Sequence, residues 1–207
     1  MKRDGVPIVV SAASGTGKTS LCRRLLETLS HVERSVSFTT RAPRGVEVNG
    51  VDYHFVDDEQ FDRMIADGEL LEWAAVFGKR YGTSERAVRD QLAAGVDVFL
   101  DIDVQGGLQI RDRFPDAILI FLLPPSMDEL RRRLSNRGTE SMDAVQRRLS
   151  EARREITHAQ AYDFLVINDD FDKAAADLRA VIISARLRVA RNGAAIAELL
   201  DEGSVRA

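Results

Sequence analysis

The stretch that decides the fold is SAASGTGKTS, residues 11–20, which follows directly on the apolar run VPIVV of residues 6–10. A short apolar run of this kind indicates a buried strand. Beyond the glycines, Leu21, Leu25 and Leu29 recur at the four-residue spacing of a helix. The sequence therefore predicts a strand, a glycine-rich loop and a helix in immediate succession, which is the layout of a phosphate-binding P-loop.

The loop carries the residue types that polyphosphate binding requires. Glycines let backbone N–H groups close around phosphates, Lys18 can reach the β- and γ-phosphates, and the Thr19 hydroxyl can ligate Mg²⁺. The positive end of the following helix favours the same anion. The usual pattern begins with glycine where this chain has Ala12, so the match is incomplete. An ordinary strand–turn–helix connection is the alternative to the nucleoside triphosphate site that we favour.

The composition is that of an ordinary globular chain of 207 residues, 44% hydrophobic, which is long enough to bury a core. The 29 basic and 33 acidic residues give a net charge of −4, which argues against a general nucleic-acid or acidic-membrane surface. Cys22 is the single cysteine, so we expect no internal disulfide and a packing role in a reducing compartment. Without a signal-peptide pattern or a membrane-length apolar run, a cytoplasmic protein is expected.

Four short apolar runs predict the strands of a parallel sheet that is covered on both faces. They are residues 8–10, 96–102, 117–123 and 164–167. Such runs are nearly continuous because neither face of the sheet meets water, and here they alternate with helical patterns. The expected fold class is therefore α/β, with a parallel core sheet flanked by helices.

Between the first two runs the pattern changes to that of a small β-rich insertion. Asn49-Gly50 is typical of a type I′ hairpin turn after the strand-like residues 35–40. Asp58 can cap a short helix that Gly68 ends, and residues 70–77 again resemble a strand. A helix near residues 84–94 then leads back to the core.

Two later helices are predicted from apolar residues at helical spacing, one through Leu130 and Leu134 and one from Met142 to Ile156. Both are rich in arginine, which suggests a mobile lid over an anion, although a solvated helix face is the alternative for several of these arginines. A C-terminal helix is expected over about residues 172–192, with a short amphipathic segment after it. This region leaves a homodimer or higher homo-oligomer open.

A second group of anion-binding side chains lies in residues 37–53. Two arginines, Arg41 and Arg44, stand there with the hydroxyls of Ser37 and Tyr53 around tight turns. Each guanidinium can donate a bidentate pair of hydrogen bonds to a phosphate monoester. From the residues alone, an exposed hairpin and an acceptor-phosphate site are equally good interpretations.

Carboxylates interrupt two of the strand-like runs. Glu72 stands within an apolar run, where a charge must either face outward or be paired. An ionised carboxylate only accepts hydrogen bonds, and guanine offers N1–H and N2–H₂ side by side, whereas N1 of adenine is an acceptor. Asp101 and Asp103 are expected on one strand face, at the C-terminal end where α/β proteins bind ligands.

The chain resembles the guanylate kinase family, in its bacterial housekeeping form, through blocks that occur in family order: SGTGKT, SFTTRAPRGVEVNGVDYHFV, LEWAAVFGKRYGTS, VFLDIDVQGG, LPPS, RLSNRGTE and VINDDFD. The resemblance spans about residues 8–187, and an alanine in place of the first P-loop glycine also occurs in bacterial members. It implies a P-loop nucleoside monophosphate kinase fold with a five-stranded parallel core sheet. The implied parts are a core of residues 1–34, 88–125 and 158–207, a β-rich GMP-binding lobe of residues 35–87 and a helical lid of residues 126–157.

The implied reaction is ATP-dependent phosphorylation of GMP, and of dGMP, to the diphosphate, with Mg²⁺ as cofactor, in guanine nucleotide biosynthesis and recycling. For the donor, the resemblance implies ATP binding by Ala12, Ala13, Ser14, Gly15, Thr16, Gly17, Lys18 and Thr19, with Asn168 and Asp169 on the adenine side. For the acceptor, it implies a GMP phosphate held by Arg41, Arg44, Tyr53 and Tyr81, and a guanine base read by Glu72 with Ser37, Thr83 and Asp103. The implied metal ligands are Thr19 and, through water, Asp101, and the implied catalytic residues are Lys18, Arg44, Arg137 and Arg148.

Two other functions stay open at this point. A kinase of another phosphorylated acceptor, such as a ribose bisphosphate, would keep the P-loop but not the set of Glu72, Ser37 and Asp103. A non-catalytic scaffold module that binds phosphopeptides would carry a degraded P-loop within a longer chain. The retained Gly17-Lys18-Thr19 argues against the second alternative.

Overall fold

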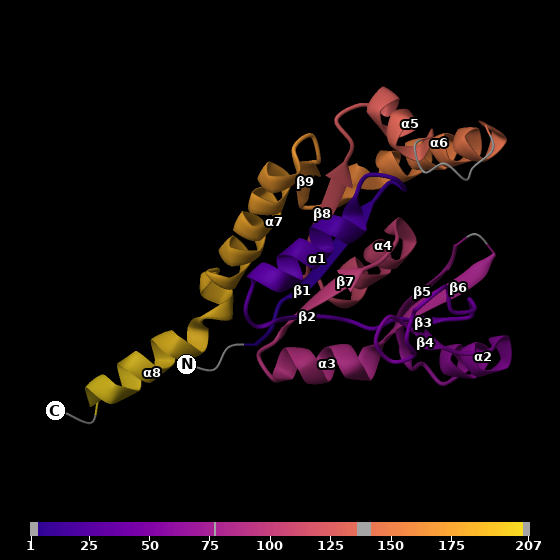
Figure 1. Ribbon diagram of the computed structural model, residues 1–207. Helices are drawn as coiled ribbons and strands as arrows, with labels where there is room; N and C mark the ends of the chain where they lie inside the picture. The colour runs from indigo at the N-terminus through magenta and orange to yellow at the C-terminus, as the bar shows by residue number, and fades with distance from the viewer. Residues whose placement is uncertain (1–3, 77, 136–141, 205–207) are drawn as a thin grey trace.

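The computed structural model describes residues 4–76, 78–135 and 142–204. Its larger sheet, here sheet A, has five strands that are all parallel and lie in the order β2-β7-β1-β8-β9 (Figure 1). The strands are β1 (Pro7–Ala12), β2 (Val32–Arg34), β7 (Asp97–Asp101), β8 (Ile118–Leu123) and β9 (Phe164–Ile167). The predicted α/β class and the five-stranded parallel sheet are confirmed.

Helices cover both faces of sheet A, because alternate strand residues point to opposite sides. Ile8 and Val10 pack in one cluster with α1 (Lys18–Thr28) and α7 (Phe171–Arg186). Val9 belongs to a second cluster, with α3 (Glu85–Ala93) and α4 (Val104–Arg113). Burial on both sides explains why the central strands are continuous apolar runs. At the sheet edge, β2 has a buried Val32 but an exposed Glu33, so no such run marked it in the sequence.

The β-rich insertion forms a second sheet, here sheet B, in the order β4-β3-β6-β5. Its strands are β3 (Phe38–Thr39), β4 (His54–Phe55), β5 (Leu70–Val76) and β6 (Lys79–Ser84). A small separate core forms where α2 (Asp58–Ala66) packs Phe61 and Met64 against Leu70. Sheet B therefore has its own apolar cluster, apart from those of sheet A.

Two local predictions within the insertion are wrong. The strands on either side of Asn49-Gly50, β3 and β4, pair parallel, so no hairpin joins them. Gly50 has a φ of 79°, but Asn49 does not share the positive φ that a type I′ turn requires at both positions. The N-cap of α2 is Asp57 rather than Asp58, since Asp57 Oδ1 accepts a 2.7 Å hydrogen bond from the Gln60 N–H.

The arginine-rich segment forms α5 (Met127–Ser135) and α6 (Met142–Thr157). Leu130, Leu134, Val145 and Leu149 pack there in a cluster that also includes Ala13 of the P-loop. The two helices thus rest directly on the loop. A 3₁₀ turn, η1 (His158–Ala161), follows α6 and leads to β9.

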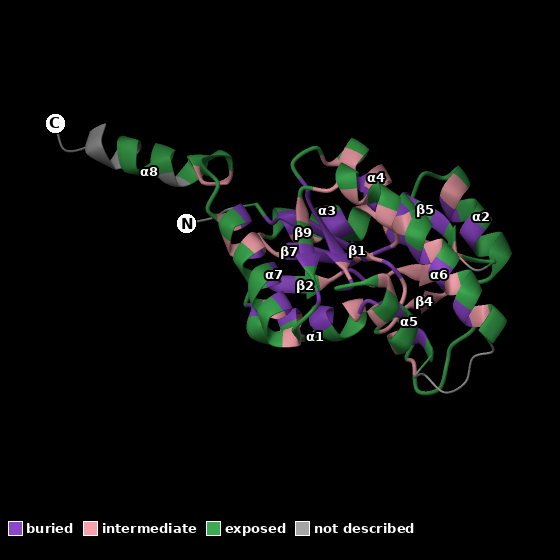
Figure 2. Cartoon of the chain, turned by 90° about the horizontal axis from the view of Figure 1, so that it is seen from above, coloured by how far each residue is buried: buried purple, intermediate pink, exposed green. Residues whose placement is uncertain are grey.

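The C-terminal helix is shorter than predicted. It ends at Arg186 and is followed by the turn η2 (Val189–Arg191) and by α8 (Gly193–Ser204). Figure 2 shows α8 extending away from the rest of the chain, with a mainly exposed surface. Within the described ranges, no helix has the length and apolarity needed to cross a membrane.

Candidate active site

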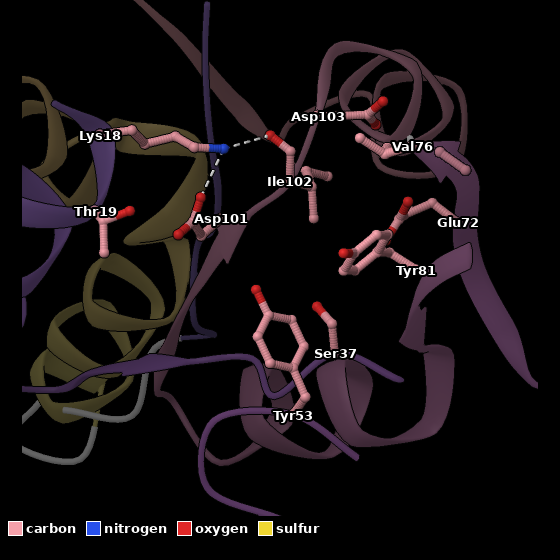
Figure 3. Close-up of a pocket in the computed structure, with 11 residues that line it drawn as sticks. Lys18, Thr19, Ser37, Tyr53, Glu72, Val76, Tyr81, Asp101, Ile102 and Asp103 are labelled. Carbon is pink, nitrogen blue, oxygen red and sulfur yellow. Dashed lines mark hydrogen bonds and ion pairs between the residues drawn. The ribbon is translucent and has the colours of Figure 1, made fainter. Parts of the chain in front are cut away.

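Two adjoining cavities lie at the C-terminal end of sheet A. The P-loop cavity, of about 320 Å³, is lined by residues 12–20 together with Val76, Asp103 and Glu155. The Glu72 cavity, of about 240 Å³, is lined by Lys18, Thr19, Ser37, Tyr53, Glu72, Ala74, Val76, Tyr81, Asp101, Ile102 and Asp103 (Figure 3). The residues that line both cavities are Lys18, Thr19, Val76 and Asp103. The predicted donor loop and most of the predicted acceptor residues therefore face one continuous site.

The P-loop joins β1 to α1 in the manner expected from the sequence. Gly17 occupies the N-cap position of α1 with a φ of 97°, in the left-handed region that favours glycine. Having no side chain, Gly17 cannot cap the helix itself. The first-turn N–H groups and the positive helix end are thus available to an anion in the P-loop cavity.

Lys18 is held toward the junction of the two cavities. Its Nζ lies 2.7 Å from Asp101 Oδ1 and donates a 3.1 Å hydrogen bond to the Ile102 carbonyl (Figure 3). Burial alone would lower the pKa of Lys18, but the neighbouring groups, chiefly the Asp101 carboxylate, together outweigh burial and raise it. Lys18 therefore stays charged, with Asp101 as its counter-ion in this conformation.

Thr19 and Asp101 offer oxygen ligands at the same place. Thr19 is exposed and lines both cavities, while Asp101 lines the Glu72 cavity. Among the residues placed by the structure, no group of three or more His, Cys, Asp or Glu side chains could hold a metal by itself. A hydroxyl and a carboxylate suit Mg²⁺ of the kind that keeps several waters and is shared with substrate phosphates.

Glu72 faces inward because β5 contains a bulge. Leu70 is opposite Ser84 but Glu72 is opposite Thr83, so β5 has one extra residue and both Leu71 and Glu72 are buried. The outward-facing alternative for Glu72 is thus wrong. Thr83 Oγ1 donates a 2.5 Å hydrogen bond to Glu72 Oε1.

The surroundings of Glu72 make its carboxyl group unusually basic. The side chain is only 4% exposed. Burial raises its pKa to about 7, opposed by the Thr83 hydrogen bond and assisted by the charge of Asp103. A Cβ atom at Gly106 of α4 would collide with Glu72 Oε2, so a glycine is needed where the helix passes the carboxylate. The fold thus leaves room for a buried acid that points into a cavity.

Asp103 reaches the site from a helix rather than from a strand. The chain leaves β7 at Asp101, and Asp103 is the N-cap of α4, where its Oδ1 accepts a 2.9 Å hydrogen bond from the Gly106 N–H. The predicted alternation of two aspartates along one strand face is therefore wrong. Both side chains still line the Glu72 cavity, because the strand end and the helix start meet there.

The hydroxyl-bearing side chains complete the Glu72 cavity. Ser37, Tyr53 and Tyr81 point into it from sheet B and its connecting loops (Figure 3). The rings of Tyr53 and Tyr81 pack edge to face with their centroids 6.0 Å apart. Polar groups from two sheets therefore converge on one volume.

The two predicted phosphate-binding arginines do not line either cavity in this conformation. Arg41 is 8% exposed and donates from NH1 and NH2 to the two carboxylate oxygens of Glu47, both at 2.9 Å. Arg44 is exposed, and its backbone N–H donates to Glu47 Oε2 at 2.7 Å. The bond from Arg41 is the main cause that lowers the pKa of Glu47. Glu47, which the sequence prediction missed, thus occupies the two guanidinium donors that the prediction assigned to a phosphate.

The residues assigned to the adenine side do not line either cavity. Asn168 is 6% exposed and donates from Nδ2 to the Thr16 carbonyl at 2.7 Å. Asp169 is exposed, 3.6 Å from Lys173 Nζ. Arg148 is half-buried on α6, and Arg137 lies outside the described residues.

Glu155 of α6 is a site residue that the sequence did not reveal. Its Oε2 accepts a 3.3 Å hydrogen bond from the Ser14 N–H, and its side chain lines the P-loop cavity. Burial raises the pKa of Glu155 to about 7, opposed by the Ser14 bond and by the charge of Lys18. The one available signal was its position between Ala152 and Ile156 at the border of the apolar stripe of α6.

Comparisons with known proteins agree with this geometry. The model of the family described as guanylate kinase matches residues 4–185. A guanylate kinase of Neisseria meningitidis serogroup A is 51% identical over 199 residues, which cover 96% of this chain and 97% of the relative. That of Geobacter sulfurreducens is 46% identical over 201 residues, which cover 97% and 99%. The crystal structure of guanylate kinase from Anaplasma phagocytophilum gives a TM-score of 0.77 at 36% identity, covering 92% of this chain and 90% of that one. The family match, the near-full-length relatives and the shared fold show that this chain belongs to the guanylate kinase family.

Proposed function

We propose that this chain transfers the γ-phosphoryl group of ATP to the phosphate of GMP, giving ADP and GDP. The observation that carries the proposal is a buried carboxylate, Glu72, in a cavity that directly adjoins a P-loop with a charged lysine. The P-loop supports a nucleoside triphosphate donor, and the carboxylate supports a guanine-bearing acceptor. Relatives named guanylate kinase over nearly the whole chain support the same reaction.

Guanine recognition follows from the hydrogen-bonding character of Glu72. When ionised, its carboxylate accepts from both N1–H and N2–H₂ of guanine, whereas adenine would present an acceptor to it. Ser37, Thr83 and Asp103 complete the proposed base-reading set. Because these residues do not address the sugar, we expect dGMP to be used as well. A ribose bisphosphate offers no pair of N–H groups to the Glu72 carboxylate, and a scaffold module would have no use for Lys18.

On the phosphate side, we propose that Arg41, Arg44, Tyr53 and Tyr81 hold the GMP phosphate. Arg41 already makes a bidentate pair with the Glu47 carboxylate, which has the shape and charge that a phosphate would replace. Binding of GMP then requires Glu47 to give up this pair and the loop of residues 41–53 to move toward the cavity. Residues 35–87 would act as the GMP-binding lobe.

On the donor side, we propose that residues 12–19 bind the ATP phosphates through backbone N–H groups. Lys18 would turn from Asp101 to the β- and γ-phosphates. Thr19, directly, and Asp101, through water, would hold Mg²⁺. When bound, the metal supplies charge neutralisation to the phosphates during transfer. Asn168 and Asp169 would flank the adenine side.

Catalysis then consists mainly of positioning and charge stabilisation. A phosphate monoester has a second pKa of about 6, so GMP is largely ionised at neutral pH and needs no strong general base. Arg44 would keep the acceptor in line with the donor, while Lys18 neutralises the moving phosphoryl group. We propose that residues 126–157 act as a lid that brings Arg148, together with Arg137, to the same group and excludes water.

Steady-state ADP release with a panel of acceptors tests the function. We expect turnover with GMP and dGMP, and a kcat/KM for AMP that is lower by about 10⁴-fold, since a site built to pair with a substrate N–H rejects analogues that lack it. UMP and ribose bisphosphates should be equally poor. Comparable rates with AMP or with a ribose bisphosphate would contradict the proposal, and the absence of turnover with every acceptor would favour the scaffold module.

A further inference from the structure

The carbonyl group of Thr16, inside the P-loop, is bound by two side chains that come from outside the loop. It accepts a 2.7 Å hydrogen bond from Asn168 Nδ2 and a 3.3 Å hydrogen bond from Arg133 NH1. The Asn168 carbonyl accepts in turn from Arg133 NH2 at 3.0 Å. The three residues therefore form a closed set of hydrogen bonds behind the loop.

The orientation of this carbonyl sets the orientation of a phosphate-binding group. In a planar trans peptide, the C=O of one residue and the N–H of the next point in opposite directions. The Thr16 carbonyl faces Asn168 and Arg133, neither of which lines the P-loop cavity, whereas Gly17 does line it. Holding the Thr16 carbonyl therefore aims the Gly17 N–H toward the cavity.

Hydrogen bonds to the Thr16 carbonyl matter because the Gly17 side of this peptide is weakly restrained by its own backbone, although the Thr16 N–H and hydroxyl are held by the Ala13 carbonyl. Gly17 has a φ of 97° and no side chain, so its own conformational preferences restrain the peptide little. Asn168 Nδ2 would lie 2.7 Å from a Cβ atom at position 17, so the amide packs closely over the glycine. Because Thr16 and Asn168 are both buried, loss of the bond would leave the Thr16 carbonyl short of a partner.

Arg133 connects the Thr16 carbonyl to helix α5. It projects from α5, and its Nε donates to Glu129 Oε1 of the same helix at 2.8 Å. Asn168 directly follows β9 of the core sheet. The hydrogen bonds thus connect α5, the end of β9 in the core sheet and the P-loop at the Thr16 carbonyl.

We propose that Asn168 and Arg133 are positioning residues for the phosphate donor: they hold the Thr16–Gly17 peptide so that the Gly17 N–H is presented to the donor phosphates. This deepens the proposed function and rests on it only in taking a nucleoside triphosphate as donor. It also differs from a contact between Asn168 and adenine, because the effect acts through the loop and does not need the base.

The test compares ligand affinities of Asn168 variants of the full chain by calorimetry. Asn168→Ala and the isosteric Asn168→Asp should each weaken binding of ATP about tenfold, because each lacks the N–H donor, and change GMP binding less than twofold. Inorganic tripolyphosphate, which has no base, should lose affinity in parallel with ATP. The matched control is Asn192→Ala, because Asn192 Nδ2 also donates to backbone carbonyls, those of Arg186 at 2.8 Å and Arg188 at 2.9 Å, away from both cavities.

A second pair separates positioning from packing on α5. Arg133→Gln should weaken ATP binding, whereas Arg132→Gln should not, although both arginines pair with Glu129. The proposal would be overturned if the Asn168 variants bound ATP as tightly as Asn192→Ala does. It would also be overturned if ATP binding fell in the Asn168 variants while tripolyphosphate binding stayed unchanged. Failure of the wild-type chain to phosphorylate GMP would contradict the proposed function and leave the ATP and tripolyphosphate results standing.

Discussion

The two halves of the site are built in opposite ways. The P-loop cavity is formed largely by one contiguous segment, residues 12–20, and offers backbone N–H groups and one lysine. The Glu72 cavity is formed by side chains from segments spread between residues 18 and 103. A backbone site tolerates a changed side chain, such as Ala12, but depends on peptide orientation. A side-chain site depends on the identity of each residue, so we expect substrate specificity to reside in the Glu72 cavity, the proposed acceptor half of the site.

The halves also share a feature that opposes folding. Each contains a glutamate, Glu72 or Glu155, whose pKa is raised from 4.5 to about 7, mainly by burial. Between these values the folded chain binds more protons than the unfolded chain, so the stability of the fold falls as pH rises through this window. Neither carboxyl group is therefore placed for stability, which is typical of groups kept for ligand binding.

The largest expected effect comes from Lys18→Ala, which removes the proposed phosphate-binding charge of the donor half. Phosphoryl transfer should fall by about 10³-fold or more, because the main protein charge on the moving group is lost. The fold and the affinity for GMP should change little. ADP release, circular dichroism and GMP calorimetry on one preparation check this. Retained turnover would mean that another group carries the charge.

Glu72→Gln breaks the acceptor half alone. It replaces an acceptor oxygen by a donor amide, so kcat/KM for GMP should fall by about 2 to 4 kcal/mol, through mispaired buried groups. ATP affinity should be unchanged, which makes it the mirror image of Lys18→Ala. Near-normal GMP kinetics in this variant would remove the assignment of Glu72 to guanine.

Arg148→Ala and Arg137→Ala test whether the lid serves the reaction rather than either cavity. We expect kcat to fall about 30-fold with little change in the affinity for GMP, since a residue used only in the closed state acts on transition-state binding. Rapid-quench kinetics measure the rate of phosphoryl transfer, and equilibrium titration measures the affinity for GMP, so the two effects can be separated. An effect confined to KM would move these arginines from catalysis to binding.

The smallest effect is the pH dependence of the acceptor half. In this account GMP binding needs an ionised Glu72, whose pKa is about 7. The affinity of the wild-type chain for GMP should therefore rise from roughly pH 6 to pH 8 by about tenfold more than the affinity of Glu72→Gln does. Because the GMP phosphate titrates identically in both proteins, the difference belongs to Glu72. Identical pH profiles for the two proteins would show that Glu72 is not the titrating group.

The contrast between the halves also explains what could be predicted from the sequence. Sheet A and the P-loop were predictable because buried parallel strands are continuous apolar runs and the loop is one segment. The three-residue edge strand β2 gave no such signal. The direction of β4 was not predictable either, since Asn49-Gly50 permits more than one turn and tertiary pairing selected the parallel arrangement.

Conformation limited the prediction of the site. Residue types that suit guanine and phosphate pointed to Glu72 and Tyr53, the family resemblance added Tyr81, and all three line one cavity. The bulge that turns Glu72 inward, the Arg41–Glu47 pair and the contact of Glu155 with Ser14 depend on three-dimensional packing. Such contacts between distant or irregular segments leave no periodic pattern in the sequence.

The most direct test of the central claim, that Glu72 reads the guanine edge, compares GMP with inosine monophosphate, which lacks the 2-amino group. In the wild-type chain, kcat/KM for GMP should exceed that for inosine monophosphate by about 100-fold, because one N–H partner of Glu72 is missing. In Glu72→Gln this ratio should fall by at least about tenfold. An unchanged ratio in the two proteins would contradict the account.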